Sequence, residues 1–357
     1  MIPKSIFDSE NCALAEKSGS LLPEWLEKIY EEKWFKLFVP KDLDGLGCNL
    51  IEALRIEEKL AKLDGSLGWT VTLCAGAGWF VGFMDESLRK EVFPRKDLCL
   101  AGSGFVGGKA DLVKGEFEIN GSWTYASGAL HATHFTANCE VLVEGHPKID
   151  AAGNPIIKAF LLERSELEIL DSWNYMGMKA TGSHAFRTEK LKVPISRGFE
   201  IDPLKNQLDD PLYQFPFLQF AEITLTVNIL GISFHMIDLI ESAFWRRNEY
   251  KKYDKKHLTY FEELVGKKKR KLQKLKVEFY KQVENAWNEL EKKGDISKKT
   301  LKKVSKISRN LTQKCREINS SLYPFSGLEA ARTDTELNRV WRDFNTVSQH
   351  SLLISPF

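Results

Sequence analysis

The sequence predicts an α+β protein made of helices, then a block of antiparallel strands, then a bundle of long helices. Apolar residues follow a helical period up to about Arg95, alternate in short runs from about Leu98 to Pro194, and return to a helical period after about Pro211. We therefore expect three domains, with the bounds 1–96, 97–200 and 201–357. At 357 residues the chain is long enough to form several subdomains.

The first part is expected to be helical. Leu22, Leu26 and Ile29 recur at helical spacing, and a second, looser stripe runs from Ile51 to Leu63. Between them, residues 39–49 are dense in Pro, Gly, Asp and Asn, which is typical of a loop.

The central part is expected to be β-structure. Its short β-branched and aromatic runs, separated by turn residues, indicate antiparallel strands that end at Pro194. The runs read GEFEINGSWTYASG, HFTANCEVLVEG, IIKAFLLER and HAFRTEKLKVP.

The last part is expected to be a bundle. Three apolar stripes at helical spacing begin at Leu225, Leu272 and Leu301, and the sequence KKGDIS supplies a Gly stop and a polar cap between the last two. Residues 246–316 hold 24 Lys and Arg against 9 Asp and Glu. We interpret these charges as a solvated helix face, with an electrostatic attraction for an anionic nucleotide as the functional alternative.

Composition excludes several classes of protein. A net charge of +2 gives no reason to expect a nucleic-acid partner, and the longest apolar stretch is broken by glycines, so no membrane span is expected. The first residues lack the apolar core of a secretory signal. Six scattered cysteines without a CxxC pair suit buried thiols in a reducing compartment, so we expect a cytoplasmic protein.

Three tempting motifs lack their required context. GSGFVG at 102–107 matches GxGxxG, but strand and turn residues follow it instead of the helix that a dinucleotide site needs. His131 and His134 form HxxH with only Cys139 nearby, so we expect no metal. No GxSxG elbow or DxDxDG loop is present.

The octapeptide GSWTYASG, residues 121–128, carries the most chemical information. A flavin needs an aromatic wall, a hydroxyl near its reactive nitrogen and glycines where backbone approaches closely. Trp123, Tyr125 and Ser127 are expected to alternate onto one strand face. Ordinary packing of an aromatic pair is the alternative that the residues alone leave open.

The chain resembles the acyl-CoA dehydrogenase family of flavoproteins over nearly its whole length. The matching segments occur in the family's order: LFVPKDLDGLG, IEEKLAKLDGSLGW, AGSGFVGGKADL, EINGSWTYASGALHA, GMKATGSHAFRTEKLKVP and LNRVWRDFNTVSQH. The resemblance implies an acyl-CoA dehydrogenase-like fold, with an N-terminal helical domain, a central antiparallel β-barrel domain and a C-terminal four-helix bundle. It also implies a flavin between the last two domains and a homo-oligomer, a dimer or tetramer.

The spelling is most similar to the two-component flavin monooxygenases of this fold, which show "W-x-[FY]-x-S-G-x-x-H-A" and end in "R-x-x-RD…H". By that resemblance Ser127 lies beside the flavin N5/O4 edge and Tyr125 forms the aromatic wall. Gly102 and Ser103 belong to the loop at the pyrimidine side. The other candidates that the matched motifs supply are Trp123 and Gly128 for the cofactor and His131 for catalysis.

The C-terminal segment differs from that of the dehydrogenases in this family. In those enzymes a carboxylate that follows the Arg-Asp pair removes a proton from the substrate. Here no acid follows Asp343, and His350 lies within about one position of that place. An imidazole can deprotonate a phenol-like substrate or supply a proton during oxygen chemistry, so His350 is the main catalytic candidate; a surface histidine is the alternative. Arg342 and Asp343 are expected to form a buried structural pair within the bundle, with a role in ligand binding as the alternative.

Two further family segments, "RxxFG" and "QxxGG", have no full match, so a loosely bound, exchangeable FAD or FMN is expected. The leading hypothesis is a monooxygenase that receives reduced flavin from a partner reductase and acts on a small aromatic or apolar substrate. The alternatives are an acyl-CoA dehydrogenase with a displaced base and a flavin-empty binding protein.

Overall fold

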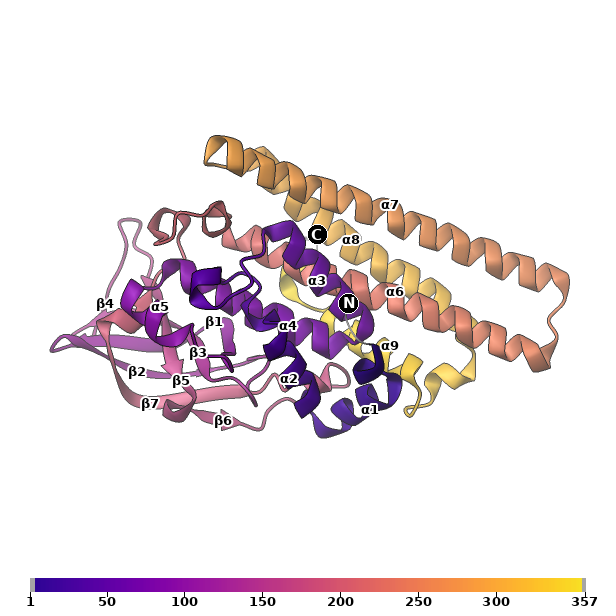
Figure 1. Cartoon of the computed structure of the whole chain (residues 1–357), viewed down its shortest axis with the longest axis horizontal. Helices are drawn as coiled ribbons and strands as arrows, with labels where there is room; N and C mark the ends of the chain where they lie inside the picture. Colours follow the sequence, from indigo (N-terminus) through magenta and orange to yellow (C-terminus); the bar gives the residue numbers. More distant parts are fainter. Residues whose placement is uncertain (1–3, 355–357) are drawn as a thin grey trace.

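The computed structural model describes residues 4–354, and it has the predicted order of helices, sheet and helices (Figure 1). The sheet occupies one end of the molecule, and the long C-terminal helices extend toward the other (Figure 1). The N-terminal helices lie between them against α6.

The N-terminal part is helical, as predicted. Its helices are α1 (Ser9–Ser18), α2 (Pro23–Glu31), α3 (Leu50–Leu63), α4 (Gly65–Gly78) and α5 (Glu86–Val92). Helix α3 begins with a capping box between Asn49 and Glu52, and the Asp64 carboxylate that follows it accepts the Leu67 N–H at 3.0 Å to begin α4.

Helix α4 is buried on nearly all sides, because glycine allows its neighbours to approach closely. A Cβ at Gly68 would lie 2.4 Å from the Ala61 Cα on α3. Two helical stretches, 65–83 and 217–251, are long and apolar enough to span a membrane, but 83% and 78% of their apolar windows are buried inside the protein. They form the core of this fold.

The central part is one eight-stranded sheet. Its path is β6-β7-β2-β1-β3-β5-β8, and β4 pairs with β3. The strands are β1 (Leu100–Val113), β2 (Glu116–Trp123), β3 (His134–Val143), β4 (His146–Pro147), β5 (Ile157–Glu163), β6 (Glu168–Leu170), β7 (Ala185–Pro194) and β8 (Gly198–Phe199).

The sheet departs from the predicted antiparallel pairing at one place. Strands β1 and β3 are parallel neighbours, with Leu100 opposite His134 and Leu112 opposite Val143. After the β1–β2 hairpin, the chain crosses back through residues 124–133 before β3 begins, which places β3 beside β1 in the same direction. That crossover contains most of GSWTYASG and determines where its side chains lie.

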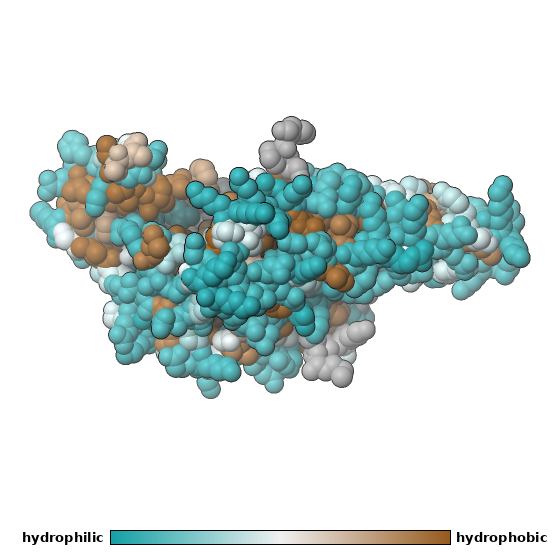
Figure 2. Space-filling model, turned by 90° about the horizontal axis from the view of Figure 1, so that it is seen from above, coloured by the Kyte–Doolittle hydropathy of each residue, from teal (hydrophilic) through white to brown (hydrophobic). Residues whose placement is uncertain are grey.

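The C-terminal part contains four α-helices among the described residues: α6 (Phe217–Lys251), α7 (Lys255–Lys293), α8 (Lys298–Leu322) and α9 (Glu336–Val347). The predicted stripes face inward, since Leu272, Phe279, Leu311 and Ile318 are all buried. Figure 2 shows a mostly hydrophilic surface at the helical end and more hydrophobic residues at the end that holds the sheet.

Candidate functional site

The crossover from Tyr125 to Gly128 is held by backbone hydrogen bonds to the segment before β7. The Ala126 N–H donates to the His184 carbonyl at 3.1 Å, and the Gly128 N–H donates to the Thr181 carbonyl at 2.8 Å. Strand β2 ends at Trp123, and Tyr125 has a left-handed φ of 65°. The predicted alternation of Trp123, Tyr125 and Ser127 on one face is therefore wrong, because the strand does not continue through them.

Ser127 lies at the end of a buried chain of hydroxyl groups. Its Oγ is 2.8 Å from the Ser183 Oγ, which is 2.7 Å from the Thr181 Oγ1. The Thr181 hydroxyl donates to the Met178 carbonyl at 2.7 Å. Since one end of this chain is fixed by a carbonyl acceptor, the remaining protons can order along it and set the direction of the Ser127 hydroxyl.

Three aromatic side chains form an exposed surface beside this segment. Trp173 stacks on Tyr175 with ring centroids 4.1 Å apart, and Tyr125 meets Trp173 edge-on at 6.3 Å. The Tyr175 hydroxyl donates to the Tyr125 hydroxyl at 3.2 Å. Tyr125 is 59% exposed, so this surface has room to receive a flat ring.

A cavity of about 750 Å³ adjoins these aromatic side chains. Leu130, three residues after Ser127, lines it together with basic groups from three separate parts of the chain. The aromatic and basic residues of the lining are Trp173, Tyr175, Lys17, Lys179 and Arg342. The lining also contains Asp171 and Glu16, which bonds Arg342, so Lys17 and Lys179 are the cations left for an anionic ligand. An aromatic wall with cations and buried hydroxyls nearby fits a flavin, whose ring is flat and whose phosphate is anionic.

Sequence reasoning missed Trp173 and Tyr175. They belong to SWNYMGM, a loop without strand or helical period, so no periodicity marks them. Two large aromatics in a polar loop that contains glycine are nevertheless a usable signal, because such a loop gives them no core of its own to fill.

Trp123 does not form part of this wall. It is fully buried within the sheet domain, stacks on Phe186 at 5.0 Å and donates its indole N–H to the Asn138 carbonyl at 2.9 Å. Its predicted role as a flavin wall is therefore wrong, and it packs the interior of the sheet domain.

Gly102 and Ser103 lie in β1, where the pairing with β3 becomes irregular after Ser103. A Cβ at Gly102 would lie 1.9 Å from the Thr136 Oγ1, so the neighbouring strand already requires glycine there. The Ser103 hydroxyl accepts the Phe105 N–H at 3.2 Å. Neither residue lines the 750 Å³ cavity.

His350 is mostly buried rather than free on the surface. Its Nδ1 accepts the Leu352 N–H at 3.4 Å, and its ring lies 5.9 Å from Trp69 of α4. Burial lowers the pKa of His350 below 6.5, so the imidazole is neutral at neutral pH.

His350 and Ser127 both lie near α4. A Cβ on Gly128 would lie 3.5 Å from Thr70, the residue after Trp69. Neither of the two cavities described here is lined by Ser127 or His350. Helix α4 is therefore a shared support for both residues, and their meeting across one cavity stays a prediction.

His131 lies below the same segment, with its ring stacked on Phe35 at 5.6 Å. Cys139, its expected neighbour, is not part of its cluster; Cys74 and Cys99 are. Burial lowers the pKa of His131 to about 4.

Arg342 and Asp343 do not pair with each other as predicted. Arg342 bonds the Glu16 carboxylate of α1, whereas Asp343 accepts the Met178 N–H at 2.5 Å. Successive helix residues point about 100° apart, so each finds a different partner. Arg339 instead bonds Asp64 at 2.5 Å.

A second cavity, of about 680 Å³, lies on the bundle between α6 and α8. Lys298, Lys302, Lys306 and Arg309 line it. These residues belong to the basic segment noted in the sequence.

The family model that matches is the acyl-CoA dehydrogenase C-terminal domain, over residues 223–354. The structure superposes on the crystal structure of 3-HSA hydroxylase from Rhodococcus sp. RHA1 with a TM-score of 0.86, covering 96% of this chain and 89% of that one at 20% identity. The chain has the acyl-CoA dehydrogenase-like fold, and its residues 223–354 match that family's C-terminal domain. Its α+β fold class is thereby confirmed.

Sequence relatives of this chain are named oxygenases. It is 25% identical to the indole-3-acetate monooxygenase of Pseudomonas putida, over 89% of this chain and 80% of the relative. It is also 25% identical to the flavin-dependent monooxygenase oxygenase subunit HsaA of Mycobacterium tuberculosis, over 59% of this chain and 54% of that protein. A second similar structure is XiaF from Streptomyces sp. in complex with FADH2 and glycerol, with a TM-score of 0.84 and 20% identity, covering 98% and 89% of the two chains.

Proposed function

We propose that this chain is the oxygenase component of a two-component flavin-dependent monooxygenase that acts on a small aromatic or apolar substrate. The relatives named above are monooxygenases, and one is named as an oxygenase subunit, which supports a separate reductase as the source of reduced flavin. XiaF, with FADH2, favours FAD over FMN, and the incomplete family segments favour loose binding.

The single observation that carries this proposal is the position of Ser127. Its hydroxyl ends the Thr181–Ser183 chain at the segment whose Leu130 lines the aromatic cavity. Because the Thr181 hydroxyl donates to the Met178 carbonyl, Ser183 donates to Thr181 and Ser127 donates to Ser183. The Ser127 oxygen is thereby held in a fixed direction and can accept a hydrogen bond from a ring N–H. Tyr125, Trp173 and Tyr175 are the residues that would hold the ring, with Gly102, Ser103 and Gly128 as the further backbone contacts.

Reduced flavin, when bound, supplies the electrons with which one oxygen atom of O2 is inserted into a substrate. The chain's own residues bind and orient the ring, exclude water and handle protons. A neutral His350 can accept a proton from an acidic substrate hydroxyl. His131, which lies behind the Ser127 segment, is the second candidate for a catalytic residue.

The alternative dehydrogenase chemistry lacks a base at the expected place. No acid follows Asp343, and the Asp343 carboxylate is buried and bonded to the Met178 N–H. Abstraction of an α-proton from an acyl-CoA needs an accessible carboxylate, so this arrangement disfavours it.

We further propose where the protein is located in the cell and how its chains assemble. Six free cysteines, five of them buried, suit a reducing cytoplasm. We also propose that the chain forms a homo-oligomer, either a dimer or a tetramer. Sedimentation of the purified chain would measure its oligomeric state.

The test follows reduced flavin directly. Reduced FAD or FMN is mixed with oxygenated buffer, with and without the chain, and the return of oxidised-flavin absorbance is timed. We expect the chain to slow that return, and Ser127→Ala to abolish most of the delay. Ser308→Ala, a buried hydroxyl of the bundle, is the matched control. An unchanged time course with the wild-type chain refutes the proposal.

A further inference from the structure

The residues beneath the Ser127 segment include a cluster of metal-ligating side chains. Cys74 comes from α4, Cys99 precedes β1, and His131 ends the crossover turn. One ligand atom from each of the three lies within 4.8 Å of the others. The three are separated in sequence by 25 and 32 residues, so only the folded chain brings them together.

His131 gives a second, independent observation. Both ring nitrogens are shut off from solvent, and neither has a hydrogen-bond partner among the described residues. A buried imidazole without a partner is costly, because it loses its bonds to water without replacing them. Its Nε2 points toward Gly128, where an added Cβ would lie 3.2 Å from that nitrogen and 2.8 Å from the Cys74 Sγ.

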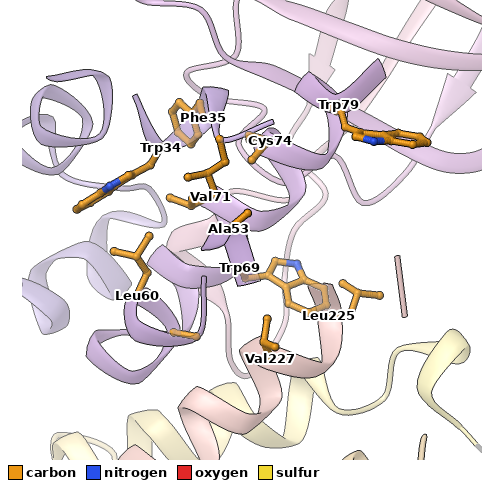
Figure 3. Packing of buried hydrophobic residues seen from close by; sticks show 14 of the residues in the cluster. Trp34, Phe35, Ala53, Leu60, Trp69, Val71, Cys74, Trp79, Leu225 and Val227 are labelled. Carbon is orange, nitrogen blue, oxygen red and sulfur yellow. The ribbon is translucent and has the colours of Figure 1, made fainter. Parts of the chain in front are cut away.

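A third unpartnered polar group lies close by. The Thr70 hydroxyl, one turn before Cys74 on α4, also has no partner within the described part of the chain. The Cys74 thiol lies 3.6 Å from the Ser127 carbonyl and also faces the Cys99 thiol. Figure 3 shows Cys74 on the side of α4 where Phe35 lies, and Phe35 is the ring on which His131 stacks.

We propose that Cys74, Cys99 and His131 form a binding site for a thiophilic metal ion of the Zn²⁺ type, directly behind the Ser127–Gly128 turn. Two thiolates and one imidazole are a donor set that Zn²⁺ takes, with a fourth position left for water or another oxygen. This inference goes beyond the proposed monooxygenase function and replaces the expectation of no metal.

The geometry is compatible with such an ion. In a tetrahedral site, bonds of about 2.3 Å to sulfur and about 2.0–2.1 Å to nitrogen place ligand atoms about 3.4–3.8 Å apart. The observed limit of 4.8 Å therefore requires a closure of about 1 Å, within the range of side-chain rotation.

Protonation also suits a metal ion. Zn²⁺ binds a neutral imidazole through a lone pair of a ring nitrogen, and neither ring nitrogen of His131 has a hydrogen-bond partner among the described residues. Zn²⁺ binds the thiolate forms of Cys74 and Cys99, so the ion must displace both thiol protons, and binding must strengthen as pH rises. Zn²⁺ has no redox chemistry, so its presence does not compete with a flavin nearby.

The first experiment measures metal content of the wild-type chain without flavin. The chain is incubated with Zn²⁺, passed over a desalting column and assayed by atomic emission. We expect about one equivalent of zinc, and with Co²⁺ we expect sulfur-to-cobalt charge-transfer absorbance from two thiolates. A wild-type chain that retains no Zn²⁺, or that contains a Cys74–Cys99 disulfide instead, overturns the proposal.

The second experiment uses ligand variants with a matched control. Cys74→Ser, Cys99→Ser and His131→Gln should each lower bound zinc to below about 0.2 equivalents, because three ligands are the minimum for retention. Cys139→Ser, another buried thiol outside the cluster, should keep it. Zinc retention in all three ligand variants refutes the site, and circular dichroism of each variant confirms that the chain is folded. Since neither assay uses flavin, failure here is separate from failure of the proposed function.

Discussion

The Asp343 carboxylate on α9 accepts the backbone N–H of Met178 at 2.5 Å, across 165 residues of sequence. Met178 belongs to the loop that carries Trp173 and Tyr175, and its carbonyl accepts the Trp173 indole N–H at 2.9 Å and the Thr181 hydroxyl at 2.7 Å. This one residue thus connects the last helix, the aromatic surface and the hydroxyl chain that ends at Ser127.

Asp343 should make stability depend on pH. Burial, and then the nearby Asp64 carboxylate, raise the pKa of Asp343 from 3.8 to about 7. The folded chain therefore binds more protons than the unfolded chain between about pH 4 and 7, and the contribution of this group to stability is lost as pH rises through that interval. Asp343→Asn keeps an oxygen that accepts from Met178 but cannot ionise.

We expect Asp343→Asn to unfold at higher urea concentration relative to the wild type as pH rises from 5 to 8, by roughly 1–3 kcal/mol at the upper end. Urea titrations at both pH values measure the difference. Asp295→Asn, an exposed residue after α7, is the control and should show no trend. Parallel pH dependence in Asp343→Asn and the wild type would contradict the assigned shift.

Substitutions of Trp173 test whether the aromatic surface binds the flavin ring. Trp173→Ala removes the ring that stacks on Tyr175, and we expect reduced-flavin affinity to fall about tenfold, or roughly 1.4 kcal/mol, whereas Trp173→Phe retains most of it. Anaerobic titration measures the dissociation constant. Tyr260→Ala, an exposed aromatic of α7, should bind like the wild type. Equal affinity in Trp173→Ala would remove this surface from the proposed site.

The sequence predicted most of the fold, since helical and strand periods are local properties. The stripes that begin at Leu272 and Leu301 lie in α7 and α8, and the strand runs match β2, β3, β5 and β7. The parallel β1–β3 pair could not be predicted in this way, because it depends on the path of the crossover rather than on either strand's pattern.

The candidate site was predicted less well, for the same reason. Ser127 and Tyr125 belong to one motif, but their environment comes from distant segments such as 173–184 and from Glu16, which is 326 residues from its partner Arg342. The cluster around His131 is likewise tertiary, since neither Cys74 nor Cys99 has a ligand at local metal spacing.

The protonation of His350 should determine how turnover decreases at low pH, which is the acid limb of the pH–rate profile. Burial lowers its pKa below 6.5, so the neutral imidazole persists to a lower pH than in a free histidine. We expect turnover to fall as pH drops through that lowered pKa. His350→Asn should lose the limb and lower kcat by about 10²-fold or more. His146→Asn, an exposed residue of β4, is the control. An acid limb that survives in His350→Asn assigns the proton to another group.

Glu57 on α3 provides a test of the helical core. It is fully buried, neither carboxylate oxygen has a hydrogen bond of ordinary geometry among the described residues, and burial raises its pKa well above 4.5 in spite of the opposing effect of the nearby Thr72 hydroxyl. Since the folded-state pKa is raised, the contribution of Glu57 to stability is present at low pH and is lost as pH rises through that pKa. Glu57→Gln should remove this loss, and Glu57→Met should also remove the unpaired polar atoms.

We therefore expect Glu57→Met to exceed the wild type in free energy of unfolding by about 1–3 kcal/mol at pH 8, with a smaller difference at pH 5. Glu57→Gln should also gain free energy of unfolding over the wild type as pH rises, but by less than Glu57→Met. The difference between the two variants separates the effect of ionisation from the effect of the lost hydrogen bonds. Glu27→Gln, an exposed position of α2, controls for a surface charge change. Destabilisation by both Glu57 variants at pH 8 would mean that the ionised carboxylate has a stabilising partner, because only a compensated buried charge is worth keeping.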